Sequence, residues 1–380
     1  MNQYNHQLTG AEFYTPIPFS FSGPDGRVEG LDGRCLPRGT GADLAVRLAG
    51  VSGLIGGALP FERQGQDYLW QAGRVLHDAA PAPVMPDFSF SSIQAEPAPQ
   101  VYAASVTQAL RAMDADASLR KVVLARTLAV TADQPLPQDA IFGRLAQDGS
   151  VTAFRVMLPD DTAGSGRALI GATPELLVSK TGGSVISHPL AGSARRQADP
   201  VADRAAHDWL AGSDKDWREH AIVVEYILDT LTPYCRDLTC PEGTTITSTG
   251  SMWHLGTRIT GRLRDGDMPS VLLASALHPT PAVCGLPCDR AAALIRQAEP
   301  VDRQFYAGAV GWTDLDRQGD GAWYVAIRCA DICGAQARLY AGAGIVPGSD
   351  PAEETTETGA KFGAMLQVLG LPADTALNKD

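Results

Sequence analysis

The chain has 380 residues, of which 44% are hydrophobic and 19% are charged, a profile typical of a globular protein with a large core. Its formal net charge is -12, so it lacks the basic surface that nucleic acid binding requires. An anionic small molecule could bind only where a few cations reverse the local potential. The opening residues do not resemble a secretory signal and no apolar run is long enough to span a bilayer, which predicts a cytoplasmic protein without a membrane partner.

In the first hundred residues the structural signals are weak. Strand patterns occur at residues 51–59 and 68–75, and the Pro-rich stretch 81–99 is predicted to be an extended connection. We expect this part to belong to one domain that spans residues 1–380, with residues 100–370 as the motif-bearing catalytic region.

From residue 100 onward, strand and helix signals alternate. Strands are predicted at 121–130, 151–158, 167–170, 252–263, 306–312, 323–331 and 337–341; a hairpin at 176–179 and 185–189; and helices at 101–114, 216–231, 291–297 and from about 351. Strands grouped in hairpins and interrupted by helices favour an α+β fold with mostly antiparallel sheets over a doubly wound parallel sheet.

Seven dispersed cysteines do not suggest a disulfide framework in a chain of this length. Two pairs, Cys284/Cys288 and Cys329/Cys333, have a C-x3-C spacing that a metal site can use. The alternating sequence around Cys329 favours buried strand thiols instead, so no zinc site is expected.

Two helix starts carry carboxylates at regular spacing. Ser213 is a suitable N-cap, and Asp216 and Glu219 then share one helical face. The ordinary explanation for such acids is a favourable interaction with the helix dipole at the surface.

Near the C-terminus, a Gly-rich loop leads into a helix with Asp350 as the expected cap. Glu354, Glu357 and Lys361 form one stripe on this helix, and their ordinary explanation is an exposed Glu–Lys pair. Together, however, the two acidic helix starts could supply the few oxygen ligands that Mg²⁺ prefers.

Three other side chains are candidates for acid–base or binding roles. Lys121 opens an apolar strand and is either a solvated strand end or a base. Glu175 is either a turn carboxylate or a general acid, and His254 is either a core histidine or a ligand of the substrate.

The order of nine stretches carries more information than any one of them. They are KVVLAR (121–126), GATPELL (171–177), HPLAGSARR (188–196), SDKDWREH (213–220), WHLGTRITG (253–261), LHPTPAVCGLP (277–287), YAGAVGW (306–312), AIRC (326–329) and YAGAGIVPGSDPAEETTETGAKF (340–362). In this order they resemble the chorismate-binding enzymes, which include anthranilate synthase component I, aminodeoxychorismate synthase, salicylate synthase and isochorismate synthase.

The resemblance implies one large domain of two stacked antiparallel sheets wrapped by helices, and a monomer. It implies that Glu219 and Glu357 ligate Mg²⁺, with Glu354 close by. For chorismate it implies two sets of contacts: Arg328, Lys361 and the backbone near Gly342 would hold the enolpyruvyl carboxylate, and Gly192, Ser193, His254 and Ala282 would line the ring site.

Within this family, the segments LAGSARR and HPTPAVCG resemble the isochorismate synthases more than the aminating enzymes. In that branch Lys121 would activate water for attack at C2, and Glu175 would protonate the departing 4-hydroxyl. The product would feed siderophore, salicylate or menaquinone biosynthesis. Salicylate synthase and the aminating enzymes stay open as alternatives, as do a metal-dependent hydrolase and a non-catalytic relative.

Overall fold

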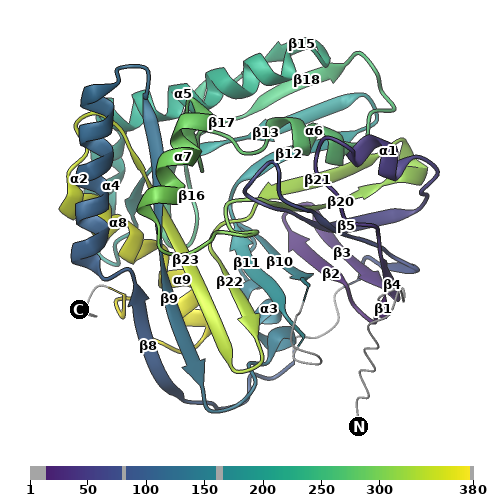
Figure 1. Cartoon of the computed structure of the whole chain (residues 1–380), viewed down its shortest axis with the longest axis horizontal. Helices are drawn as coiled ribbons and strands as arrows, with labels where there is room; N and C mark the ends of the chain where they lie inside the picture. Colours follow the sequence, from purple (N-terminus) through teal and green to yellow (C-terminus); the bar gives the residue numbers. More distant parts are fainter. Residues whose placement is uncertain (1–13, 79–82, 160–165, 377–380) are drawn as a thin grey trace.

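Two large antiparallel β-sheets pack against each other (Figure 1). The computed structural model describes residues 14–78, 83–159 and 166–376. Among these residues every strand pairing is antiparallel. The α+β class predicted from the grouped hairpin signals is therefore confirmed.

Each sheet draws its strands from distant parts of the chain. The first sheet has the order β1 (Tyr14–Thr15), β4 (Gly33–Cys35), β6 (Tyr68–Gln71), β5 (Leu54–Leu59), β20 (Ala309–Asp314), β21 (Asp320–Val325), β12 (Leu176–Thr181), β13 (Ser184–His188), β18 (Ile259–Leu263) and β15 (Cys235–Thr239). The second has the order β19 (Gly285–Leu286), β9 (Lys121–Ala132), β23 (Gln336–Ile345), β22 (Cys329–Cys333), β11 (Ala168–Thr173), β10 (Thr152–Met157), β2 (Phe19–Gly23), β3 (Gly26–Leu31) and β7 (Arg74–Leu76), and β8 (Phe90–Glu96) also pairs with β9. A small third sheet consists of β14 (Leu190–Arg195), β17 (Met252–Thr257) and β16 (Thr244–Ser248). Because strands from the first hundred residues enter both large sheets, that weakly patterned part is integral to the domain.

The main hydrophobic core lies between the two large sheets. Phe21 of β2 stacks on Tyr324 of β21, with ring centroids 6.5 Å apart. Side-chain alternation on β11 shows how one strand serves two cores: Leu169 belongs to the core between the sheets, whereas Ala168 and Ile170 belong to a second core on the outer face.

Helices cover the outer faces. They are α1 (Leu44–Leu48), α2 (Pro99–Ala115), α3 (Gln138–Leu145), α4 (Pro200–Ala211), α5 (Asp214–Leu231), α6 (Ser270–Leu277), α7 (Cys288–Ala298), α8 (Pro351–Lys361) and α9 (Gly363–Val368). Residues of α3 and α9 complete the outer core of the second sheet, and α6 packs on β12, β20 and β21 of the first. Helix α2 lies beside α8 at one edge of the molecule (Figure 1).

Some predicted elements differ from the structure. The stretch 81–99, predicted to be a connection, contains β8, whose residues 90–96 include no proline and can donate backbone hydrogen bonds. The strand predicted at 323–331 is two strands in different sheets, because the chain turns at Arg328 with a positive φ of 52°. The strand predicted at 252–263 is likewise divided between the third and first sheets, and β20 begins at Ala309 rather than at residue 306.

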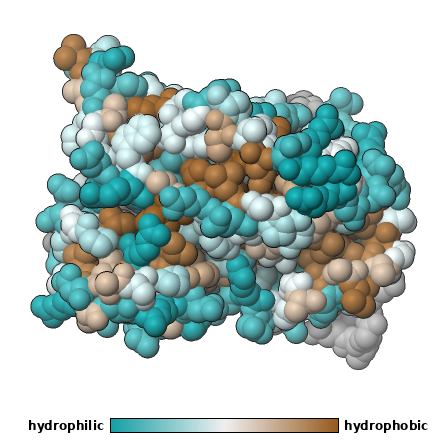
Figure 2. Space-filling view, turned by 90° about the horizontal axis from the view of Figure 1, so that it is seen from above, coloured by the Kyte–Doolittle hydropathy of each residue, from teal (hydrophilic) through white to brown (hydrophobic). Residues whose placement is uncertain are grey.

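In the described part of the chain, no helix is both long and apolar enough to cross a membrane. Large exposed hydrophobic side chains are spread over several elements, for example Val46 on α1, Val101 on α2 and Trp209 on α4. On the face in Figure 2, hydrophobic areas are likewise interrupted by hydrophilic ones.

Candidate active site

A cleft lies where the chain passes between the sheets. Most residues predicted for the site line it: Glu175, Gly192, Ser193, Glu219, His254, Ala282, Arg328, Gly342, Glu357 and Lys361. Lys121 and Glu354 do not line the cleft and lie behind other site residues. Residues that are far apart in the sequence are thus brought together from both large sheets, the third sheet and two helices.

Glu175 lies at the crossover from β11 in the second sheet to β12 in the first. Its backbone N–H bonds to the Thr173 hydroxyl at 3.3 Å, and its carbonyl accepts the Val325 N–H at 3.1 Å. The side chain is buried, and this burial raises the pKa of Glu175 to about 8 despite the opposing effect of Lys121. The carboxyl is therefore protonated near neutral pH and can act as a general acid.

Arg328 lies at the opposite crossover, from β21 to β22. Its backbone adopts the left-handed region, and its carbonyl accepts the Ala172 N–H at 3.1 Å, which ties the two crossovers together. Burial lowers the pKa of the guanidinium from its ordinary value, but an arginine stays charged. The described residues provide it with no ion-pair partner. It is a buried cation available to an anionic substrate.

The third sheet supplies the polar wall of the cleft. A bulge in β14 places Gly192 at a φ of 76°, and a Cβ there would lie 2.8 Å from the Cβ of Asp216. Ser193 follows and pairs with His254 on β17. Burial, with Arg328 and Lys361 nearby, holds the pKa of His254 well below its usual value, so the ring is neutral. Its buried Nε2 has no hydrogen-bond partner and is available to a ligand.

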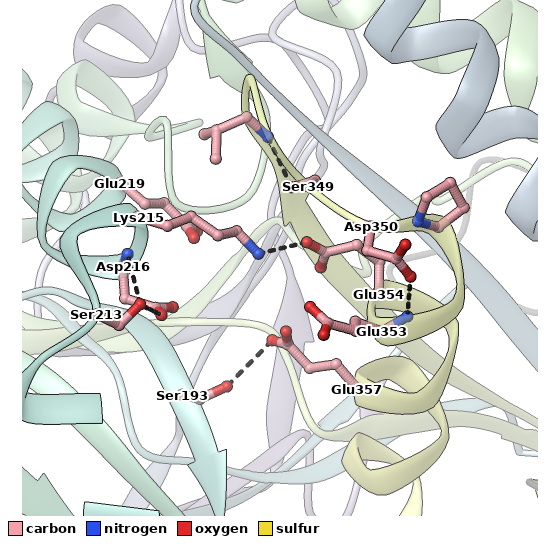
Figure 3. A network of polar contacts seen from close by, with 12 residues as sticks. Ser193, Ser213, Lys215, Asp216, Glu219, Ser349, Asp350, Glu353, Glu354 and Glu357 are labelled. Carbon is pink, nitrogen blue, oxygen red and sulfur yellow. Dashed lines mark hydrogen bonds and ion pairs between the residues drawn. The ribbon is translucent and has the colours of Figure 1, made fainter. Parts of the chain in front are cut away.

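Carboxylates from α5 and α8 face each other across the cleft (Figure 3). Both helices begin as the sequence predicts. Ser213 accepts the backbone N–H of Asp216, and Asp350 accepts that of Glu353. These caps fix where the first helical turns begin and therefore where the acids that follow point.

Each of the three glutamates predicted as metal ligands faces a lysine. Glu219 Oε1 lies 2.9 Å from Lys121 Nζ, Glu354 Oε1 lies 2.5 Å from Lys215 Nζ, and Glu357 Oε1 lies 2.5 Å from Lys361 Nζ. Glu357 also accepts a hydrogen bond from Ser193 at 3.1 Å (Figure 3). Each of the three carboxylates thus has one cationic partner.

The pKa values of two of these carboxylates, Glu354 and Glu357, are shifted in opposite directions. Burial and the neighbouring Glu357 raise the pKa of Glu354 to about 7, and its Oε2 is buried without a hydrogen-bond partner. For Glu357, burial opposes ionisation, but Lys361 and Lys215 keep its pKa below the usual range. Within the described ranges, no three acidic, His or Cys side chains are already close enough to form a metal cluster.

Lys121 lies at the start of β9, completely buried behind Glu219. Its closest charged neighbour is the Glu219 carboxylate. Gly344 on β23 makes room for the pair: a Cβ at this position would lie 2.2 Å from Glu219 Oε1 and 3.0 Å from Lys121 Cε. Gly344 is thus a site residue that the sequence analysis missed.

We expect Gly344→Ala to fold, because a flexible glutamate tip can move aside, but to lower turnover by on the order of 100-fold since Glu219 and Lys121 are displaced. Steady-state kinetics and thermal unfolding would measure both effects. Gly183→Ala is the matched control, because a Cβ there meets no atom within 4 Å. Equal turnover in both variants would mean that the position of the pair does not matter.

Two other parts of the site were also missed. Tyr306 and Tyr340 line the cleft and stack with their ring centroids 4.7 Å apart, and a Cβ on Gly342 would lie 2.9 Å from the Tyr306 hydroxyl. Lys215 holds Glu354 from across the cleft. Tyr306, Tyr340 and Lys215 lie in three different motifs, which begin at residues 306, 340 and 213, and only the folded chain shows which of their side chains meet.

A family model described as "Chorismate binding enzyme" matches residues 62–370, most of the chain. The chain therefore belongs to the chorismate-binding enzymes. The match includes every site residue described above.

Individual relatives show which members of this family the chain resembles. The chain is 45% identical to isochorismate synthase DhbC of Bacillus subtilis over 282 residues, which cover 73% of this chain and 70% of the relative. It is 40% identical to MenF of Mycobacterium tuberculosis over 95% of this chain and 98% of that protein. The crystal structure of DhbC from Bacillus anthracis superposes with a TM-score of 0.86 at 38% identity, covering 94% of this chain and 98% of that one. These comparisons confirm the predicted fold and family.

Proposed function

We propose that this enzyme is an isochorismate synthase, which converts chorismate to isochorismate. The observation that carries the proposal is Glu175, a buried carboxyl protonated near neutral pH, in a cleft that it shares with unpaired Arg328. A hydroxide ion is a poor leaving group, so its departure needs a positioned acid. The relatives with the same activity support this reading.

The cations of the cleft fit a substrate with two carboxylates. Arg328 is buried without an ion-pair partner, and Lys361 donates to the Gly342 carbonyl at 3.0 Å. These groups would bind the enolpyruvyl carboxylate through charge-assisted hydrogen bonds. Ser193 and the neutral His254, with the small Gly192 and Ala282, would contact the ring.

The acidic side of the cleft fits Mg²⁺. Glu219 and Glu357 line the same cleft, and the buried Oε2 of Glu354 lacks a partner. Mg²⁺ takes few protein carboxylates and keeps several waters, so a preformed cluster is not required. When bound, the ion would neutralise these glutamates and ligate the ring carboxylate of the substrate. The carboxylate of Glu219 would then be shared with the ion, which weakens its hold on the Lys121 ammonium.

The chemistry itself falls to two side chains. Lys121, in its neutral form, takes a proton from water as the water oxygen bonds to C2 of the ring. The two ring double bonds shift, the C4–O bond breaks, and Glu175 gives its proton to the departing hydroxide. One water is added and one is released, so the product is an isomer of the substrate.

Incubating the purified protein with chorismate and Mg²⁺, followed by HPLC, tests the proposal. Isochorismate as the main product is the expected result. Salicylate with pyruvate, or anthranilate when ammonium is supplied, would assign a sister activity instead. Unchanged chorismate with every divalent metal tried would contradict an active synthase.

We expect Glu357→Gln to raise the Mg²⁺ concentration needed for half-maximal activity by on the order of 10- to 100-fold, because one oxygen ligand loses its charge. A calorimetric titration with MgCl₂ alone would measure the affinity without turnover. Glu353→Gln, an exposed position on the same helix, is the control. Unaltered Mg²⁺ affinity in Glu357→Gln would exclude this residue as a ligand.

A further inference from the structure

The two C-x3-C pairs have the same spacing but different geometry. None of the seven cysteines, all of which lie in the described ranges, forms a disulfide. The Sγ atoms of Cys284 and Cys288 lie 3.2 Å apart, within hydrogen-bonding distance. Cys329 and Cys333 are the two ends of strand β22, where four residues of extended chain separate them by about 13 Å. Only the first pair has sulfur atoms close enough to form a disulfide after a small shift.

The two thiols of the close pair have different surroundings. Cys284 is fully buried, whereas Cys288 is half-buried and is the first residue of α7. The hydrogen bond between the two thiols, with the charge of Arg63 nearby, lowers the pKa of Cys288, and the same contact raises the pKa of Cys284. A thiolate at a helix start next to a cation is the reactive form of cysteine. Cys288 is therefore the attacking thiol and Cys284 its buried partner.

The segment between the two cysteines packs against the backbone of Lys121. Gly285 and Leu286 form β19 and pair with Val122 and Lys121 of β9. The fit is tight, because a Cβ on Gly285 would lie 2.2 Å from the Lys121 carbonyl oxygen.

The same segment is also continuous with the wall of the cleft. The Cys284 carbonyl accepts the Val123 N–H at 2.9 Å. The two residues before Cys284, Ala282 and Val283, line the cleft. Movement of Cys284 is therefore transmitted to the site from two directions.

We propose that Cys284 and Cys288 are a redox-sensitive dithiol, which closes to a disulfide on exposure to a hydroperoxide and thereby slows turnover. The Cys288 thiolate attacks the peroxide, breaks its O–O bond and becomes a sulfenic acid, and the second oxygen leaves after protonation as water from hydrogen peroxide or as an alcohol from an organic hydroperoxide. The Cys284 thiol then displaces the sulfenic oxygen as water, and the S–S bond forms. Two thiols are oxidised and one peroxide is reduced.

The geometry also accounts for the loss of activity. A disulfide needs sulfur atoms about 2.05 Å apart, so the present 3.2 Å contact must shorten. Because Cys284 is enclosed on all sides, the shift displaces Ala282, Val283 or the strand that carries Lys121. Reduction by a dithiol restores the original contact.

The test treats the intact protein with hydrogen peroxide and then measures both the bond and the rate. We expect the peptide that contains residues 284–288 to lose two hydrogens by non-reducing mass spectrometry, and turnover to fall several-fold and recover with dithiothreitol. Cys288→Ser should keep the untreated rate and resist inactivation. Cys333→Ser, from the pair with the same spacing, should respond as the wild type does.

Three results would overturn the proposal: no bridged peptide, a bridged peptide with an unchanged rate, or equal inactivation of Cys288→Ser. The mass measurement does not depend on which reaction the enzyme catalyses. Failure of the proposed function is therefore distinguishable from failure of the redox proposal.

Discussion

Glu175→Gln is expected to lose turnover by about 100- to 10,000-fold while still binding chorismate, because the amide keeps the shape of the carboxyl but cannot donate its proton to the leaving group. Stopped assays of isochorismate formation, together with calorimetric titration of chorismate, would separate the two effects. Glu225→Gln, on the exposed side of α5, controls for the loss of one carboxylate. Near-normal turnover in Glu175→Gln would refute its role as the acid.

The pH dependence follows from the same carboxyl. Since burial raises the pKa of Glu175 to about 8, its active, protonated form is present below that pH and is lost above it. Turnover by the wild type should therefore fall as pH rises through about 8. The free energy of unfolding changes with pH in the same direction. The contribution of the protonated carboxyl to stability is fully present below its unfolded pKa of 4.5 and disappears as pH rises through about 8. A rate that increases steadily across this range would contradict the assignment.

Lys121→Met is expected to reduce turnover by a similar factor, about 100- to 10,000-fold, because the methionine fills the space but cannot take a proton from water. The variant also leaves the Glu219 carboxylate without its partner. Breaking a buried ion pair in this way costs about 3–5 kcal/mol, so the free energy of unfolding should fall as well. Product formation and chemical denaturation measure the two consequences separately.

A second buried lysine provides the matched control. Lys180 is also fully buried and lies 2.8 Å from its partner Asp320, but it belongs to the hairpin β12–β13, and Asp320, unlike Glu219, does not line the cleft. Lys180→Met should lose a comparable amount of stability and keep its turnover per folded molecule. If both variants lost turnover equally, the effect of Lys121→Met would be structural rather than catalytic.

The sequence predicted local structure well where short-range signals determine it. The hairpin β12–β13 is one example, because Gly182 takes the positive φ that its turn requires. Another is α8, whose cap residue Asp350 was identified directly. The division of the predicted strand 323–331 was not foreseeable, since its apolar alternation continues through Arg328 and only tertiary packing imposes the turn there.

For the site, the family motifs identified residues that the structure brings into one cleft, but they did not predict how charges pair. Lys121 pairs with Glu219, a contact between residues 98 positions apart that no local pattern encodes. Gly344 and Lys215 were missed for the same reason. Gly344 matters because it leaves space for the Glu219 side chain, and Lys215 matters because it pairs with Glu354. In both cases the neighbour comes from a distant segment of the chain.

The two crossovers give the fold a further property. Glu175 and Arg328 stand on the links between the sheets, whereas Lys121 is carried by the second sheet alone. The relative position of these two side chains, the proposed acid and base, therefore depends on how the two sheets pack, to which the stacked rings of Phe21 and Tyr324 contribute. Substitutions that change the spacing of the two sheets would change the reaction rate, although the substituted residues contact no reactant. The enzyme has therefore little freedom to vary its core without also varying its rate.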